Sequence, residues 1–151
     1  MEIISLIEKK NILFDTLIAS KSELFQRLAE LLNRNGYVSD QNLFIEALYA
    51  REAESSTGIE KGFGIPHAKS QSVIEPTIAF AHVNELEDYI ALDESKVECL
   101  FMIAVPEQAN DKHLEILSFL ARKLMDDEIK EKLKSATNED EVMQILIEIG
   151  G

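Results

Sequence analysis

Several residue types that define other classes of protein are scarce in this 151-residue chain. Its single cysteine permits neither an internal disulfide nor a cysteine-based zinc cluster. Its longest unbroken apolar run covers seven residues, 99–105, whereas a membrane-spanning helix needs about 18 to 20. With only three prolines, six glycines and no low-complexity tract, nothing marks a linker, so we expect one domain over residues 1–151.

Positive charge is also scarce, since 15 Lys and Arg residues face 28 Asp and Glu residues and the net charge is −13. Nucleic acids and anionic membrane surfaces both require a basic face, so we expect neither as a partner. No basic region precedes the first apolar residues, which argues against a signal peptide and leads us to expect a cytoplasmic protein. The 46% hydrophobic and 28% charged residues are typical of a globular domain with its own core.

Helical signals occur at five places. A capping-box pattern at 20–23 predicts a helix that ends near Gly36, and a second helix is predicted from Asp40 to about Arg51. Asp111 is placed to cap a third helix, and short helices are predicted over 127–133 and from 138–141 onward. The inward positions expected on these last helices are Leu114, Leu117, Ala121, Leu124, Val142, Ile145 and Ile149.

Strands are predicted over 12–18, 77–83 and 97–105. The third of these is almost entirely apolar and ends at Pro106, which is typical of a central strand covered on both faces. Because strands and helices are interleaved along the chain, we expect an α/β fold built around a central sheet.

Residues 55–67 break the local periodicity. Three of the six glycines lie between 58 and 64, where they allow positive φ and the close approach of another backbone or an anion. Pro66 fixes its own φ and restricts the residue before it, so the chain is stiff just ahead of His67. This pattern suits a histidine whose ring must be reached by a partner, and a glycine-proline loop that happens to contain a histidine is the alternative. The segment matches no nucleotide-binding loop.

The other two histidines have different settings. His113 lies in the first turn of a predicted helix, where an imidazolium is disfavoured, an anion is favoured and a neutral ring can donate to an oxygen. A solvated helix residue is its alternative interpretation. His82 shares strand parity with Ile78 and Phe80 and is interpreted as an edge or core residue. The intervals of 15 and 31 residues between the histidines resemble no zinc motif, so we expect no metal site.

Two further residues have ordinary explanations when taken alone. Arg51 ends a predicted helix, where an arginine commonly interacts with the helix dipole at the surface. Cys99 lies inside the apolar strand, and burial there would raise its thiol pKa, so we interpret it as a packing residue.

Taken together, these motifs resemble a known signature. Arg51-Glu52, Ser56-Thr57-Gly58, the run GFGIPHAK at 62–69 and His113-Leu114 are similar to the enzyme IIA domains of the fructose/mannitol class. These domains belong to the bacterial phosphoenolpyruvate-dependent sugar phosphotransferase system. The likeness extends over essentially the whole chain and is greatest to the fructose branch. It implies a mixed, mostly parallel sheet with helices on both faces.

The resemblance implies a phosphotransferase that acts as a phosphocarrier. In the family, the histidine after the proline takes a phosphoryl group from the carrier protein HPr and gives it to a cysteine of a IIB domain, which phosphorylates the sugar. Carried over, His67 is the phosphorylated nucleophile, and His113 is the second active-site histidine, which stabilises the phosphoryl group. Arg51 matches the active-site arginine, and the Ser56-Thr57-Gly58 turn lines the phosphate pocket. No cofactor or metal is implied, because the incoming phosphoryl group is already activated.

Two positions depart from the family pattern. Gly64 stands where many members have alanine, and Glu60 stands where members often have glycine, which would alter the shape or charge of the loop. The chain has no candidate IIB cysteine loop, so the acceptor and the membrane component IIC are expected elsewhere. A regulatory protein of the nitrogen-related branch and a binding module that has lost transfer are the two alternative functions.

Overall fold

The computed structural model describes residues 3–109 and 111–150, so the ends of the predicted domain, residues 1–2 and 151, lie outside the described part. A short 3-10 helix, η1 (Ile3–Ser5), precedes the first strand. Within the described residues, no helix combines the length and the apolar character needed to cross a membrane.

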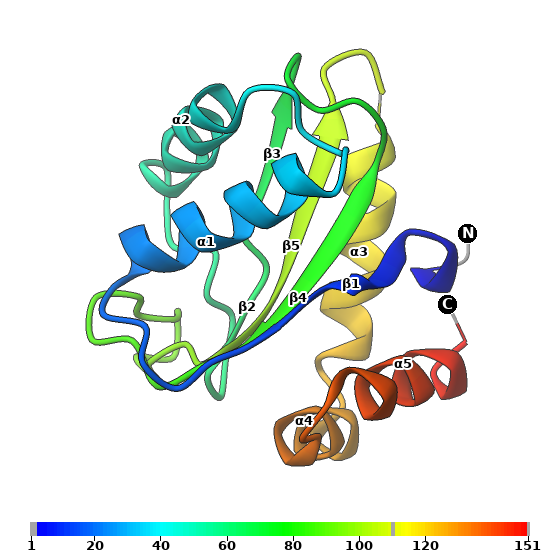
Figure 1. The fold of residues 1–151 in the computed structure, drawn as a ribbon. Coiled ribbons are helices and arrows are strands. Elements are labelled where there is room, and N and C mark those ends of the chain that lie inside the picture. The colour runs from blue at the N-terminus through cyan, green and yellow to red at the C-terminus, as the bar shows by residue number, and fades with distance from the viewer. Residues whose placement is uncertain (1–2, 110, 151) are drawn as a thin grey trace.

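One five-stranded mixed sheet forms the centre of the molecule (Figure 1). β4 and β5 are antiparallel, while β1 pairs with β4, and β2 and β3 pair with β5, in parallel. Three of the four strand pairs are therefore parallel, which confirms the predicted mixed, mostly parallel sheet. The strands are β1 (Ile7–Phe14), β2 (Phe63–Gly64), β3 (His67–Ser70), β4 (Thr77–His82) and β5 (Cys99–Pro106).

Helices cover both faces of this sheet, as predicted (Figure 1). One face carries α1 (Lys21–Arg34) and α2 (Gln41–Glu52). The other carries α3 (Lys112–Lys123), α4 (Asp127–Ser135) and α5 (Glu139–Glu148). The result is a single α/β domain in three layers.

Strand alternation divides the core into two clusters. Along β4, Ala79 and Ala81 face the α1–α2 layer, while Ile78 and Phe80 face the α3–α5 layer. β5 lies between its partners and is buried at every residue except Pro106, which explains its continuous apolar sequence.

The predicted helix caps are largely confirmed. The Ser20 hydroxyl accepts from the Glu23 N–H at 3.1 Å, and the Asp40 carboxylate accepts from two N–H groups of α2. Gly36 follows the end of α1 with φ of +87°, and Asn138 caps α5. Asp111 occupies the N-cap position of α3, but its side chain makes no capping hydrogen bond there.

Some local predictions are wrong. The first strand spans Ile7–Phe14 rather than 12–18, because its pairing with β4 begins at Ile7 and a turn follows it, in which the Leu17 N–H donates to the Asp15 carboxylate. On α3, Leu114 is 50% exposed although it was expected to face inward, and Ile116 and Leu120 are buried; Leu124, which follows the helix, is buried as predicted. The buried face is therefore centred on Ile116 and Leu120, while the predicted Leu117 and Ala121 are partly buried against the same core. The outward apolar positions border the hollow described below.

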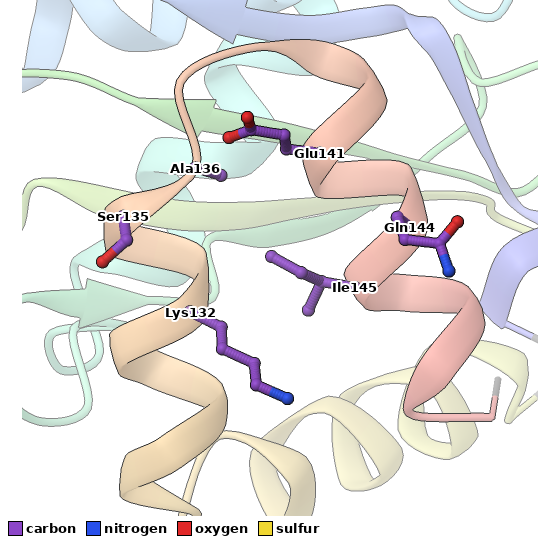
Figure 2. A pocket seen from close by; sticks show the side chains of 6 residues that line it. All are labelled: Lys132, Ser135, Ala136, Glu141, Gln144 and Ile145. Carbon is purple, nitrogen blue, oxygen red and sulfur yellow. The ribbon is translucent and has the colours of Figure 1, made fainter.

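A shallow hollow separates α4 from α5 (Figure 2). Its lining holds no histidine, arginine or cysteine side chain, so it offers no group suited to the predicted chemistry. Its lining residues are Lys132, Ser135, Ala136, Glu141, Gln144 and Ile145.

Candidate functional site

His67 is the first residue of β3, at the edge of the sheet. It lies opposite Ile103 in the parallel pairing with β5, and the Ile103 N–H donates to the Pro66 carbonyl at 2.9 Å. Ala68, the next residue, is buried in the α1–α2 core. The histidine is therefore anchored on both sides in the sequence, as the stiff Pro66 segment predicts.

The glycine-rich segment before His67 is a β-hairpin, not an open loop. The Ile59 N–H donates to the Phe63 carbonyl, and the Phe63 N–H donates to the Glu60 carbonyl at 3.0 Å. At the turn, Lys61 and Gly62 have φ values of +50° and +80°. Positive φ at both central positions is typical of a type I′ turn, whose twist suits a hairpin.

The other two glycines of the hairpin serve close packing. A Cβ at Gly58 would lie 2.7 Å from the Ala91 Cα, and one at Gly64 would lie 3.0 Å from the Tyr89 hydroxyl oxygen. Of the three glycines, only Gly62 has positive φ. The segment thus uses its glycines to approach other parts of the protein.

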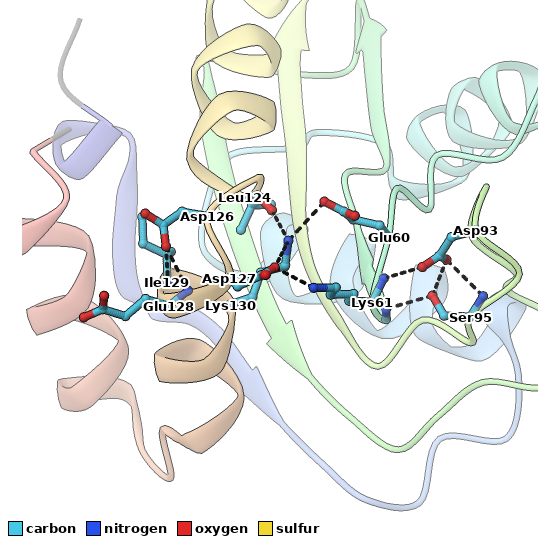
Figure 3. Close-up of polar contacts among 11 residues, drawn as sticks. Glu60, Lys61, Asp93, Ser95, Leu124, Asp126, Asp127, Glu128, Ile129 and Lys130 are labelled. Carbon is cyan, nitrogen blue, oxygen red and sulfur yellow. Dashed lines mark hydrogen bonds and ion pairs between the residues drawn. The ribbon is translucent and has the colours of Figure 1, made fainter.

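Polar contacts hold the turn from outside (Figure 3). The Lys61 N–H donates to Asp93 Oδ2 at 2.9 Å. Hydrogen bonds from Ser95, followed by that from Lys61, lower the pKa of Asp93 to about 2. Lys130 Nζ, almost fully buried, lies 3.1 Å from Glu60 Oε1, so the unusual Glu60 is paired with a cation of α4.

The hydrogen bond of the His67 ring defines its tautomer. Nδ1 lies 2.8 Å from the carbonyl oxygen of Ile65. A carbonyl oxygen can only accept, so Nδ1 carries the proton in the neutral ring and Nε2 keeps its lone pair.

The surroundings of His67 favour that neutral form. Burial lowers the pKa of His67 below its usual value of 6.5, and the hydrogen bond to Ile65 opposes this. The positive charge of Arg51 and the electrostatic influence of His113 lower the pKa further, whereas the Glu52 carboxylate raises it. The ring is therefore neutral near pH 7, with Nε2 available as a nucleophile.

Three of the predicted residues meet in one hollow, which we call the His67 hollow. It lies at the β3 edge of the sheet, where α2 and α3 approach from opposite faces, and its lining includes His67, Arg51 and His113. Arg51 is in the last turn of α2, and its Nη1 donates to the Ser55 carbonyl at 2.8 Å. The hollow therefore combines a neutral imidazole, a second histidine and a permanent cation.

The Ser56-Thr57-Gly58 turn lies beside this hollow. Ser56 and Thr57 line an adjoining hollow that also contains Arg51 and His67. The Ser56 hydroxyl donates to the Ile90 carbonyl at 2.6 Å and accepts from the Gly58 N–H. The Thr57 hydroxyl bonds to protein groups as well, and Gly58 packs against Ala91. Both hydroxyls are therefore engaged within the protein.

Two charged residues of the His67 hollow were not predicted as site residues from the sequence. Lys69 lies two residues after His67 on β3, and Glu54 follows α2. Side chains two residues apart on a strand lie on the same face of the sheet, so a predicted strand here would have placed Lys69 beside His67. Residues 67–70 show no strand pattern that would have allowed this prediction.

The remaining candidates lie elsewhere. His82 ends β4 and lies opposite Cys99, whereas His67 lies opposite Ile103, four residues further along β5. The Nε2 of His82 is 3.8 Å from the Glu98 carboxylate. Burial raises the pKa of the Cys99 thiol well above its usual value, as expected of a packing residue. Within residues 3–109 and 111–150, no three His, Cys, Asp or Glu side chains are grouped as a metal site requires.

Comparison with known proteins points to one family. Residues 5–149 match the family described as phosphoenolpyruvate-dependent sugar phosphotransferase system, EIIA 2. A fructose-specific EIIA component from Haloferax volcanii is 40% identical over 131 residues, which cover 87% of this chain and 85% of the relative.

Solved structures share the fold. The nitrogen regulatory protein IIA-Ntr from Neisseria meningitidis has a TM-score of 0.86 at 34% identity, covering 95% of this chain and 98% of that one. Enzyme IIA mannitol from Escherichia coli, solved in complex with phosphorylated enzyme IIB mannitol, has a TM-score of 0.77. It is 21% identical and covers 95% of this chain and 99% of that one, so this likeness concerns the fold alone.

Proposed function

The chain belongs to the EIIA type 2 family of the phosphoenolpyruvate-dependent sugar phosphotransferase system, and from this membership we propose that it is a phosphohistidine carrier. Residues 1–151 form the carrier domain, and His67 accepts a phosphoryl group from phospho-HPr. The group then passes to a cysteine of a IIB domain, which phosphorylates a sugar during uptake. The name of the Haloferax relative supports fructose as that sugar.

One observation carries the assignment: the Nδ1 proton of His67 is directed to the Ile65 carbonyl while the ring lines the same hollow as Arg51 and His113. In the first step, the Nε2 lone pair bonds to phosphorus as the nitrogen–phosphorus bond of phospho-HPr breaks. The electron pair of that bond returns to the HPr histidine. In the second step, the IIB thiolate attacks phosphorus and the Nε2–phosphorus pair returns to His67.

The other groups of the hollow stabilise charge. The phosphoryl oxygens remain anionic throughout the transfer, so catalysis depends on position and electrostatic stabilisation. Arg51 and His113 donate to these oxygens, and the Ile65 carbonyl stabilises the positive charge that develops on the His67 ring. Ser56, Thr57 and Gly58 shape the wall beside them.

We infer that partner proteins dock on the surface around the His67 hollow. Leu114, half exposed, and Leu117 provide an apolar rim on α3, next to the charged groups. HPr is the donor that contacts this rim, and IIB is the acceptor, which accords with the mannitol IIA structure solved with phosphorylated IIB. The carrier acts in the cytoplasm and reaches the membrane component only through IIB.

The test is the intact mass of the protein after incubation with phosphoenolpyruvate, enzyme I and HPr. Wild type should gain one phosphoryl group, and His67→Ala should gain none while keeping the wild-type circular dichroism spectrum. His82→Ala, a histidine outside the hollow, is the matched control and should be phosphorylated like wild type. Phosphorylation of His67→Ala would overturn the assignment.

A regulatory role is the second candidate, because the nitrogen regulatory protein from Neisseria meningitidis shares the fold at 34% identity. Both functions predict phosphorylation of His67. They differ in the next step, since a transport carrier passes its phosphoryl group to a IIB cysteine and a regulator does not. Loss of the phosphoryl group to an added IIB domain would favour transport.

A further inference from the structure

A buried chain of polar side chains runs behind the His67 hollow. The Thr57 hydroxyl contacts both the Glu52 carboxylate and the Tyr89 hydroxyl. A carboxylate only accepts, so Thr57 donates to Glu52 and accepts from Tyr89. The Tyr89 side chain is fully buried, Thr57 is 5% exposed, and the Glu52 side chain is 5% exposed.

This chain joins three parts of the fold. Glu52 ends α2, Thr57 begins the hairpin, and Tyr89 lies in the segment between β4 and β5. Lys21, the first residue of α1, places its Nζ 3.4 Å from Glu52 Oε1 and 5.2 Å from the centre of the Tyr89 ring. Lys21 thus balances the charge of Glu52 and is the last side chain of the network.

One backbone hydrogen bond and one bond from the His67 ring connect the network to that ring. The Ile65 N–H donates to the Thr57 carbonyl at 2.9 Å. The Ile65 carbonyl in turn accepts from His67 Nδ1 at 2.8 Å. A shift of Thr57 therefore moves the group that sets the His67 tautomer.

Tyr89 also contacts the other strand of the hairpin. A Cβ at Gly64 would lie 3.0 Å from the Tyr89 hydroxyl oxygen and 3.3 Å from Cζ. The hydroxyl that bonds to Thr57 thus fills the space that an alanine side chain would need at position 64. One side chain fixes both edges of the hairpin next to Ile65.

We propose that Tyr89, acting through Thr57 and Glu52, is a positioning residue that holds the Ile65 carbonyl against His67 Nδ1. Without this support, part of the population places the proton on Nε2, where it blocks attack on phosphorus. The inference rests on the proposed role of His67 as the phosphoryl acceptor. Its structural half, control of the tautomer, does not depend on that role.

The first experiment measures ¹⁵N chemical shifts of the His67 ring in the unphosphorylated protein at pH 8. Wild type should show one tautomer, with the proton on Nδ1. Tyr89→Phe, which removes only the hydroxyl, and Thr57→Val should both show a mixture. Thr57→Ser retains the hydroxyl and should restore the single tautomer, which a purely structural loss of packing would not do.

The second experiment measures acceptance from phospho-HPr. Loss of one buried hydrogen bond, worth about 1 kcal/mol, predicts a roughly fivefold lower rate for Tyr89→Phe with unchanged KM for HPr. Tyr49→Phe is the matched control, since Tyr49 is on the outer part of α2 at 36% exposure, and should react like wild type. Gly64→Ala should also lower the rate, and adding Tyr89→Phe should give less than the product of the two effects, because the hydroxyl that clashes is gone.

A folded Tyr89→Phe variant with a single Nδ1–H tautomer and the wild-type rate would overturn the proposal. Thr57→Ser and Thr57→Val behaving alike would overturn it as well. If wild type fails to accept a phosphoryl group, the proposed function fails, while the nitrogen shifts still decide whether Tyr89 positions the ring.

Discussion

At the scale of single residues, the site depends on where one proton lies. His67 is neutral because it is buried, and its Nδ1 proton is committed to the Ile65 carbonyl. Arg51 and His113 lower the pKa of the same ring, so the two side chains proposed to bind the phosphoryl oxygens also help to keep the nucleophile unprotonated. In the proposed reaction, the side chains that bind the phosphoryl group thus add to the effect of burial, which is the largest cause of the lowered pKa.

His113→Ala should slow phosphoryl acceptance roughly 100-fold, because it removes one donor to the transition-state oxygens. Single-turnover rates with phospho-HPr measure this effect. The fold should be retained, since His113 lies at the start of α3 and outside both core clusters. A rate equal to that of wild type would remove His113 from the reaction.

The pH dependence follows from the depressed pKa of His67. Because the pKa lies below 6.5, the ring is already neutral at pH 7, and raising the pH further creates no additional nucleophile. Acceptance should therefore be flat from about pH 7 to 8 and fall as the pH drops below about 6.5. NMR titration of the His67 ring provides the direct check, and a midpoint above 6.5 would contradict it.

At the scale of elements, the hairpin before β3 is the part that positions the site. Its turn is tied to the segment before β5 by Asp93, and to α4 by Lys130 (Figure 3). Lys130 Nζ also donates to the Leu124 carbonyl at the end of α3 at 2.7 Å. One buried cation, Lys130, thus connects the hairpin with the end of α3 and with α4.

Lys130→Met should lower the free energy of unfolding by about 1 to 3 kcal/mol, because the Leu124 carbonyl and Glu60 lose a charged donor. Lys132→Met is the matched control on the same helix, where the side chain is 50% exposed, and should change stability by less than about 0.5 kcal/mol. Urea unfolding of both variants gives the comparison. Equal stabilities would show that the Lys130 contacts add nothing.

The sequence predicts elements well where the signal is local. The caps at Ser20, Asp40 and Asn138 and the apolar pattern of β5 are such signals, and the structure confirms them. β2 and β3 span only two and four residues and exist through pairing with β5, so no local pattern predicts them.

The candidate site divides in the same way. The motifs around Arg51, His67 and His113 are visible in the sequence, and the structure brings these three residues into one hollow. Lys69 escaped notice because it depends on recognising β3. The role of Tyr89 is not predictable from the sequence, because Tyr89 lies 32 residues from Thr57 along the chain and contacts it only after folding.

At the scale of the whole molecule, an acidic chain must receive an anionic group. The net charge is −13, yet the His67 hollow contains two cations, Arg51 and Lys69, against one carboxylate, Glu54. These local cations attract the phosphoryl group at short range. The wider negative surface favours a partner with a basic face at long range.

Acceptance from phospho-HPr should therefore be steered by charge. We expect kcat/KM to fall several-fold between about 50 and 500 mM salt, because screening weakens attraction between complementary surfaces. Rates that rise with salt would mean that repulsion dominates the encounter, contrary to this account. A matched series in which sucrose replaces salt controls for changes in stability.

The most direct test of the central claim is the position of the phosphoryl group on the phosphorylated protein. Combined ³¹P and ¹⁵N NMR of ¹⁵N-histidine-labelled protein distinguishes the two ring nitrogens of His67. We expect a phosphorus–nitrogen bond at Nε2, with the proton still on Nδ1 and directed to Ile65. Phosphorus on Nδ1, or on any residue other than His67, would contradict it.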